Sequence, residues 1–451
     1  MTRAIIVSSD GHGGIPRDAY RSYIEQKYHA DFDDYDNTLS AWESGQSTPF
    51  PVEVCRDRDE IADRTQFMDS QNRLRELEKM GVVGEVIFPG ASPATNPPWS
   101  DFLSADTFRT RTPRTRELQW AGERAYNRWL SEFCLDAPGR RVGLALLPLH
   151  DMEATVKEIY WAKENGLGGV VFPNFNYDLP EYVHGWYWDP MFRACEEVGF
   201  PLNLHGGNGG ISIGEHKALT ALEFEFFAKR PFWHLIFGGA FDRFPNLKVA
   251  TTESTASWIP EMFVGLDAIY SEFKRANEHR TILIDDQHLP ERLPSEYWNT
   301  NGFVGVSLVR LDEMEARDRI GVGTMMYGVD YPHPEGTWGQ AMTWMQAAIG
   351  RAGVSEQEAR MMLGLNAARC YGLDLDVLAP IAERVGPAIE EVLAKPADAE
   401  VADLLKGANE DGFVLAARHY ESGSILSGES TIDFVSQAPG EAPRKKTQSD
   451  H

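Results

Sequence analysis

Eight short apolar runs, spread along most of the chain, constrain its fold more than any other feature of the sequence. Most are near-continuous stretches of Val, Ile, Leu and Phe rather than alternating ones, which is typical of strands buried on both faces of a parallel sheet. We therefore predict parallel strands at Ala4–Ser9, Val82–Phe88, Val142–Leu147, Gly169–Phe172, Pro201–Leu204, Leu247–Thr252, Phe303–Leu308 and Gly323–Val329.

Amphipathic segments with helical periodicity separate most of these runs. The clearest are Arg64–Met80, Arg116–Cys134, Met152–Asn165 and Pro190–Val198. A strand followed by a helix, repeated eight times, is the pattern of an α/β fold of the (β/α)8 or TIM barrel type. A length of 451 residues suits one such barrel with long βα-loop insertions and a C-terminal helical extension.

The same pattern predicts the domain organisation. Residues 1–373 are expected to form the barrel, with two long connections at 11–63 and 89–114. Because loops that follow strands lie at the catalytic face of a barrel, these two are candidate lids, and oligomer contacts are the alternative. Residues 374–420 are predicted to be a helical extension, and 421–451, rich in Ser, Gly, Pro and charge, a disordered tail.

The formal net charge of −25 argues against nucleic acid as a partner, because a phosphate backbone would be repelled. Four scattered cysteines without a C-x-x-C pair argue against a disulfide scaffold or an iron–sulfur cluster. We expect no membrane association, because no stretch approaches the roughly 18 apolar residues of a membrane span. With no secretory apolar run at the N-terminus, we expect a cytoplasmic protein.

Side chains that commonly bind metals stand at the ends of several predicted strands. Because the C-terminal strand ends of a barrel meet at one mouth, we expect these side chains to converge there and to bind metal. They are Asp10 and His12 after the first strand, His205 at the end of the fifth, Glu253 at the end of the sixth, and Asp330 and His333 after the eighth.

Each of these residues has a structural alternative when taken alone. A single strand-end His is commonly a hydrogen-bonded structural residue. Glu253 also suits the first turn of a helix, where a carboxylate interacts with backbone N–H groups. Asp330 suits a turn before Pro332, and His333 is either a further ligand or a turn residue held between prolines. The shared position at strand ends favours a common metal site.

Several motifs resemble the amidohydrolase-related family of metal-dependent TIM barrels. The likeness covers roughly residues 4–373, and its most specific part is the block Asp330–Trp338. The family includes hydrolases, nonoxidative decarboxylases and hydratases, so the resemblance implies the fold more firmly than the reaction. The motifs are Asp10-x-His12, Leu204-His205-Gly206-Gly207, Phe241-Asp242-Arg243-Phe244-Pro245, Pro294-Ser295-Glu296-Tyr297, Gly328-Val329-Asp330-Tyr331-Pro332-His333, and Asn366–Tyr371.

The sequence also departs from the pattern of the hydrolytic members. Gly14 stands where they usually carry a second histidine, and Glu253 stands where many of them carry another. No lysine is found near Asn174, where some members have a carboxylated lysine that bridges two metals. These departures shift the ligand set from nitrogen toward oxygen, which suits iron or manganese better than zinc.

The predicted ligands, Asp10, His12, His205, Glu253 and Asp330, are too many for one open tetrahedral zinc, and they suit two metals. The chain resembles a branch similar to nonheme diiron monooxygenases of diterpenoid biosynthesis. This resemblance implies two Fe(II) per chain, a hydrophobic acyl substrate linked to coenzyme A, an external electron donor such as a reductase or ferredoxin, and a homodimer. Asp330, Glu253 and His333 would be its catalytic residues.

The main alternative is a mononuclear hydrolase or nonoxidative decarboxylase that uses Zn or Mn. In that case Asp330 serves as both metal ligand and general base, and Glu253 orients a ligand or the substrate. A third alternative, a barrel without catalytic activity that serves in binding, is disfavoured because a decayed site has no reason to keep buried charge.

Overall fold

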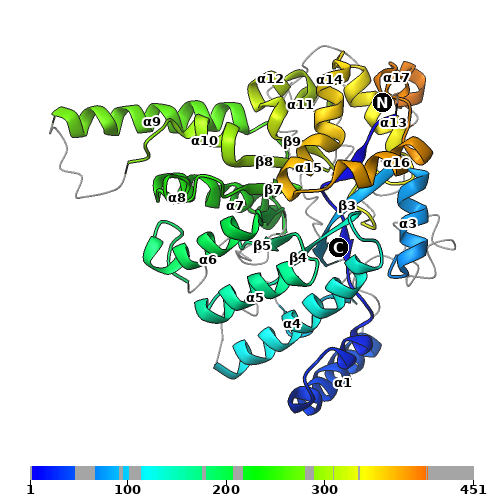
Figure 1. The fold of residues 1–451 in the computed structure, drawn as a ribbon, viewed down its shortest axis with the longest axis vertical. Helices are drawn as coiled ribbons and strands as arrows, with labels where there is room; N and C mark the ends of the chain where they lie inside the picture. Colours follow the sequence, from blue (N-terminus) through cyan, green and yellow to red (C-terminus); the bar gives the residue numbers. More distant parts are fainter. Residues whose placement is uncertain are drawn as a thin grey trace, which may run out of the picture.

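The computed structural model describes residues 3–45, 67–90, 95–100, 113–174, 179–206, 217–279, 289–307, 309–333, 336–402 and 404. These residues build a parallel barrel surrounded by helices (Figure 1). Neighbouring strands pair in the order β1-β3-β4-β5-β6-β7-β8-β9, so each main strand lies next to its successor in the chain. This is the order of a (β/α)8 barrel, and it confirms the predicted fold class.

Each of the eight predicted apolar runs overlaps one main strand of the sheet, most with bounds shifted by one or two residues. Every residue of these strands is buried, which explains their continuous rather than alternating apolar character. The strands are β1 (Ile6–Ser8), β3 (Val82–Pro89), β4 (Arg141–Ala145), β5 (Gly169–Val171), β6 (Leu202–His205), β7 (Val249–Thr252), β8 (Gly302–Val306) and β9 (Met325–Tyr327).

Hydrogen bonds between the first and last strands bring the two edges of the sheet together. The backbone N–H of Ser9 donates to the carbonyl of Tyr327 at 2.8 Å. Beyond the strand ends, the N–H of Asp330 donates to the carbonyl of Asp10 at 3.1 Å, and Gly11 and Tyr331 form a parallel bridge. The short strand β2 (His12–Gly13) pairs with β3 just beyond β1. These contacts hold the segments after β1 and β9 side by side.

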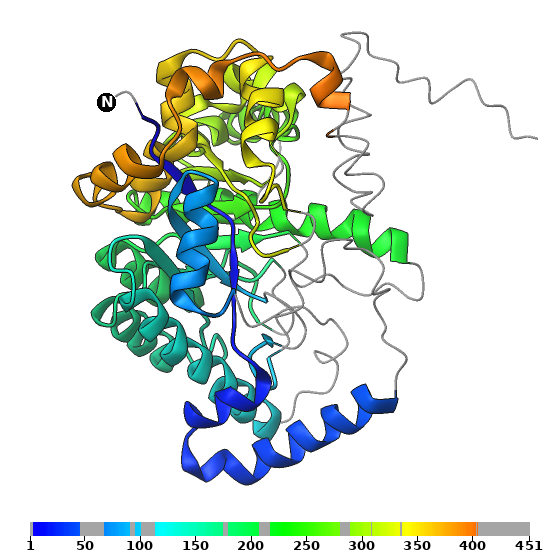
Figure 2. The same ribbon diagram turned by 90° about the vertical axis from the view of Figure 1, so that its right-hand side faces the viewer.

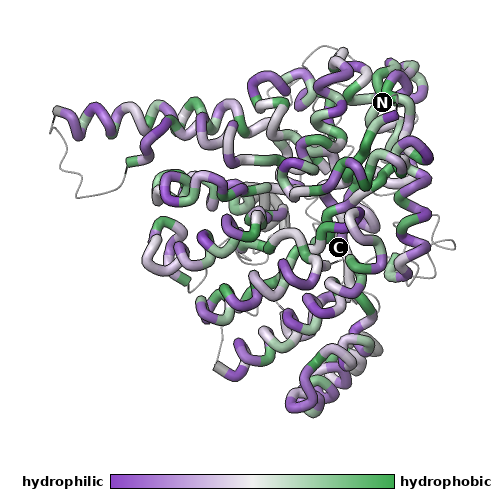
Figure 3. The backbone as a smooth tube through the Cα atoms, viewed as in Figure 1, coloured by the Kyte–Doolittle hydropathy of each residue, from purple (hydrophilic) through white to green (hydrophobic). Residues whose placement is uncertain are grey.

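Helices cover the outside of the barrel, and Figure 3 shows hydrophobic and hydrophilic turns alternating along them. Their bounds are α3 (Ser70–Lys79), α4 (Pro113–Leu135), α5 (Met152–Glu164), α6 (Gly185–Val198), α7 (Lys217–Phe237), α8 (Ala240–Arg243), α9 (Ile259–His279), α10 (Pro294–Asn301), α11 (Leu311–Glu315), α12 (Arg317–Ile320), α13 (Ala341–Met345), α14 (Glu356–Arg360) and α15 (Asn366–Tyr371). Among the described residues, no helix combines the length and apolar character needed to cross a membrane.

Helix α6 begins five residues before the predicted start at Pro190. Proline favours the first turn of a helix, but Pro190 lies inside α6. The preceding turn is helical as well, because Trp188 is fully buried and packs against Phe172 and Phe192. Burial of one aromatic side chain therefore extends the helix toward its N-terminus.

The long connection predicted at 11–63 is partly helical. It contains the short strand β2 and the helix α1 (His29–Gly45), which lies outside the barrel in Figure 2. Phe32 anchors this helix by packing its ring edge-on against Trp99 of the second long connection. Residues 46–63, 91–94 and 101–112 of the two candidate lids lie outside the described residues, and the second lid ends with Pro113 and Arg114 at the start of α4.

The chain continues past the barrel into α16 (Leu375–Val385) and α17 (Ile389–Leu393), within the predicted helical extension. Val401 and Leu404 then pack in a small apolar cluster with Leu311, Trp344 and Ala347. The predicted disordered tail at 421–451 lies outside the described residues.

Candidate metal centre

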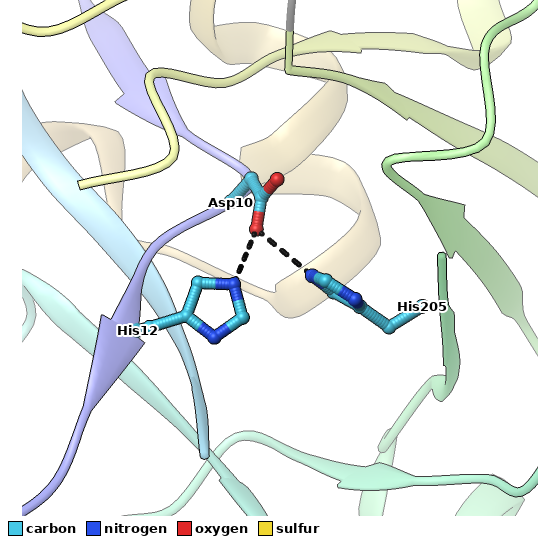
Figure 4. A group of neighbouring side chains, drawn as sticks. All are labelled: Asp10, His12 and His205. Atoms are coloured by element: carbon cyan, nitrogen blue, oxygen red, sulfur yellow. Dashed lines mark hydrogen bonds and ion pairs between the residues drawn. The ribbon is translucent and has the colours of Figure 1, made fainter. Parts of the chain in front are cut away.

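Three of the predicted ligands converge at the C-terminal ends of β1 and β6. Asp10 follows β1, His12 begins β2, and His205 is the last residue of β6. The Oδ1 atom of Asp10 lies 3.5 Å from Nε2 of His12 and 3.4 Å from Nε2 of His205. All three side chains are buried, and both imidazoles point toward one carboxylate oxygen (Figure 4).

A second group shares His12 with the first. The Oδ1 atom of Asp330 lies 3.4 Å from Nε2 of His12 and 3.0 Å from Nδ1 of His333. Asp330 is buried and adopts a left-handed backbone conformation, with φ of 54°, which Asp tolerates better than most residues do. The turn after β9 thus brings a second carboxylate to the same imidazole. Ligand atoms within each group all lie within 4.8 Å of one another.

Backbone carbonyls orient all three imidazoles. Nδ1 of His12 lies 2.8 Å from the carbonyl oxygen of Pro89, and Nε2 of His333 lies 3.0 Å from that of Gly90. Nδ1 of His205 lies 2.5 Å from the carbonyl oxygen of Gly206. Since a carbonyl only accepts, each of these nitrogens carries the proton and donates it. In a neutral ring the other nitrogen then presents its lone pair to a carboxylate, as in metal-ligating histidines.

This arrangement fits a cation. Nε2 of His12 is buried and makes no hydrogen bond with any described residue, although carboxylate oxygens lie 3.4 Å and 3.5 Å away. Lone pairs of nitrogen and oxygen that face one another in a buried site repel, and a divalent cation between them turns the repulsion into coordination. The donor set of imidazoles and carboxylates suits zinc, manganese or iron.

The protonation states of His12 and Asp10 follow from their burial and from the charged or polar groups beside them. Burial and the neighbouring His333 lower the pKa of His12 to about 3, so this ring is neutral at pH 7. Burial alone would raise the pKa of Asp10, but the adjacent imidazoles of His12 and His205 outweigh it and hold that pKa well below its usual range. Asp10 is therefore ionised, as a metal ligand must be.

Glu253 lies outside both groups of ligand atoms. Its Oε2 atom is 3.4 Å from Nδ1 of His205, on the side of the ring that also bonds to a backbone carbonyl, and its side chain is 29% exposed. Like Asp330, it has a left-handed backbone, with φ of 52°. This position suits a residue that orients His205. A direct role of Glu253 as a metal ligand stays a prediction.

The structure changes the balance of ligand types expected from the sequence. His333 joins the cluster in addition to His12 and His205, while Glu253 lies behind one of these rings. The two groups together therefore hold three imidazoles and two carboxylates. The sequence led us to expect a shift from nitrogen toward oxygen, which favoured iron or manganese, and the two observed groups contain more nitrogen donors than that expectation.

Two residues near the centre were absent from the sequence prediction. Ser307, just after β8, donates a hydrogen bond to Oδ2 of Asp10. Arg73 of α3 donates to the carbonyl oxygen of His12 at 2.8 Å. Ser307 lies at a predicted strand end, which is the signal that marked the other site residues. Arg73 lies four residues before Leu77, the other buried residue of α3. An arginine on the buried face of a predicted helix is the feature of the sequence that could have identified it.

The sequence matches a family model described as Amidohydrolase over residues 105–373, which is more than half of the chain. The matched region includes His205, Asp330 and His333, whereas Asp10 and His12 precede it. No curated protein matches the sequence.

Solved structures with the same fold cover most of the chain. An amidohydrolase from Mycobacterium avium subsp. paratuberculosis aligns with a TM-score of 0.58 at 17% identity, over 83% of this chain and 99% of its own. A manganese-bound 5-carboxyvanillate decarboxylase from Novosphingobium aromaticivorans gives 0.57 at 19%, over 82% and 97%. A 2,6-dihydroxybenzoate decarboxylase from Rhizobium gives 0.53 at 18%, over 82% and 99%. At these identities the likeness shows the fold.

Proposed function

Since this chain belongs to the amidohydrolase family, we propose that it is an enzyme dependent on a divalent metal that catalyses hydrolysis or nonoxidative decarboxylation. The observation that carries the proposal is the buried cluster around His12, whose Nε2 faces Asp10 and Asp330. The fold of two decarboxylases, one of them with bound manganese, supports it further.

The residues that would hold the cation are Asp10, His12, His205 and Asp330, with His333 as a further donor next to Asp330. Zinc or manganese bound there would act as a Lewis acid toward a substrate oxygen or lower the pKa of a bound water. The backbone carbonyls at Pro89 and Gly206 hold the rings of His12 and His205 in the tautomers that such binding needs.

Proton transfer is proposed for Asp330. Its carboxylate is buried and lies 3.0 Å from Nδ1 of His333. His333 in turn donates from Nε2 to the carbonyl of Gly90, which holds the ring in place. Asp330 would take a proton from water during hydrolysis, or deliver one to the carbon that loses the carboxylate during decarboxylation.

A diiron monooxygenase is supported less well than this function. That expectation depended on Glu253 as an additional oxygen ligand, and Glu253 lies on the far side of His205 from Asp10. The coenzyme A-linked acyl substrate and the external electron donor were expected only for a diiron monooxygenase, so they are supported no better than that function. Three imidazoles suit zinc better than the oxygen-rich ligand set that was expected, and manganese is supported by its presence in one structural relative.

Metal analysis tests the proposal directly. Protein purified from medium containing iron, manganese and zinc should carry about one manganese or zinc per chain. Asp10→Asn and His205→Ala should lose that metal, while His184→Ala, a change at an exposed histidine outside the cluster, should keep it. Two irons per chain together with oxygen uptake would support the monooxygenase instead. Failure of the wild type to retain any metal would favour the inactive binding barrel.

Activity assays separate the two reactions. A panel of hydroxylated aromatic carboxylic acids, the class named for two of the structural relatives, should release CO2 if the chain is a decarboxylase. Amides and lactones should be opened, with uptake of water, if it is a hydrolase. Turnover of neither class by the manganese or zinc form would contradict the proposed function.

A further inference from the structure

Arg73 is a fully buried guanidinium that reaches from α3 to the two chain segments carrying the proposed ligands. Its Nη1 atom donates to the carbonyl oxygen of His12 at 2.8 Å, and Nη2 to that of Tyr331 at 3.5 Å. Its guanidinium also lies over the Tyr331 ring, 5.1 Å from the centroid. Tyr331 directly follows Asp330, so one side chain contacts the backbone beside two proposed metal ligands.

The charge of Arg73 is balanced from the opposite side. Glu85 of β3 is buried and accepts hydrogen bonds from Nε and Nη2 of Arg73 at 2.7–3.0 Å. The planar guanidinium has five donors in a fixed fork, so it holds a carboxylate through two nitrogens and still reaches two carbonyls, whereas an ammonium group has three donors and no such fork. Glu85 therefore holds Arg73 in the orientation from which it reaches His12 and Tyr331.

A second arginine shares the same carboxylate. Arg141 of β4 is buried and donates from Nε to Oε1 of Glu85 at 3.2 Å. Its remaining hydrogen bonds run to the carbonyl of Phe133 and to the hydroxyl and carbonyl of Ser70, away from the cluster. The two arginines thus resemble each other in burial and in their acidic partner, and differ in what else they contact.

We infer that Arg73 is a positioning residue for the metal centre, which holds the His12 and Asp330 segments at the spacing that coordination needs. This inference rests on the proposed metal-dependent function. The N–H of His12 donates to the carbonyl of Tyr331 at 2.8 Å, and Arg73 bonds to the carbonyls of both residues. Loss of the guanidinium removes one hydrogen bond from each of these carbonyls and so loosens the spacing between the two segments. Loss of an outer contact of this kind typically weakens metal binding about 10–100-fold.

A structural ion pair is the competing explanation, and Arg141 provides the matched control. Arg73→Met and Arg141→Met each remove one buried cation from Glu85, so both should lower the melting temperature. Only Arg73→Met removes contacts to the segments that carry ligands. Arg73→Lys retains the charge next to Glu85 without the fork geometry. If the Met variant is insoluble, this Lys variant distinguishes the positioning role from a structural ion pair.

The test is the affinity of the metal-free proteins for Mn²⁺, measured by competition with a chelator. Wild type should bind, Arg141→Met should bind within about threefold of it, and both Arg73 variants should bind about 10–100-fold more weakly. Equal weakening in Arg141→Met, or unchanged affinity in the Arg73 variants, would overturn the positioning role. A wild type that binds neither Mn²⁺ nor Zn²⁺ would instead overturn the proposed function itself.

Discussion

The imidazole rings of His12 and His333 lie face to face, with centroids 3.8 Å apart and planes inclined by 26°. Both rings donate to consecutive backbone carbonyls at the end of β3, those of Pro89 and Gly90. Their other nitrogens lie 3.4 Å and 3.0 Å from the same oxygen of Asp330. The end of one strand therefore orients two rings toward one carboxylate. From the sequence alone, His333 could be either a further metal ligand or a turn residue.

Replacing His333 by Phe keeps a flat ring against His12 and removes the nitrogen that faces Asp330. If His333 contributes to cation binding, the affinity of the metal-free protein for Mn²⁺ should fall about tenfold or more. Chelator competition measures this, with His184→Phe as the control at an exposed histidine. An unchanged affinity would make His333 a turn residue.

Glu253→Gln should keep the full metal content of the wild type. Its carboxylate lies 3.4 Å from Nδ1 of His205, so the amide still packs against the ring and only the charge is lost. We expect turnover to fall about 10–100-fold, because partners of metal-ligating histidines tune ligand basicity. Metal analysis and kinetics on the same preparation check both statements. A loss of half the metal would instead make Glu253 a ligand of a second ion.

Glu313 predicts a pH-dependent stability. Burial raises the pKa of this carboxyl group to about 7 in the folded chain, above its ordinary value of 4.5. Folding therefore favours the protonated form, and the stability from this group is full below about pH 4.5 and lost as the pH rises through 7. Glu313→Gln mimics the protonated form at every pH, and it can still accept the hydrogen bond from the N–H of Ala256.

The advantage of Glu313→Gln over the wild type should therefore grow between pH 5 and pH 8, by about 1–3 kcal/mol in the free energy of unfolding. Urea unfolding of metal-free protein measures it at each pH. The exposed neighbour Glu315, changed to Gln, should show no such growth. The same difference at both pH values would mean that Glu313 stays ionised or protonated throughout.

The end of the described chain stabilises the fold through Val401 and Leu404. Both pack against Leu311, Trp344 and Ala347, so truncation after Lys395 should cost about 3 kcal/mol of buried apolar contact. Truncation after residue 425 keeps that cluster and should leave the melting temperature within a degree or two of the full chain. Calorimetry on both truncations checks the difference, and equal destabilisation would mean that the segment after 425 packs on the barrel.

The sequence was sufficient to predict the barrel fold and to place four of the residues that meet at the barrel's mouth. Strands buried on both faces are near-continuous apolar runs, so all eight could be located without any tertiary information. Parallel strands in a barrel point the same way, so Asp10, His12, His205 and Asp330 could be expected at one mouth. Those inferences depend only on local residue types and on a topology that permits few exceptions.

The tertiary structure decided which of the remaining side chains meet. Glu253 and Asp330 both have left-handed backbones at strand ends, yet one contacts the outer side of His205 and the other lies within the cluster. Ring orientation depends on the carbonyls of other segments, and the placement of His12 depends on Arg73, distant in sequence. The direction of a side chain in a turn follows from such long-range contacts, which local residue types do not encode.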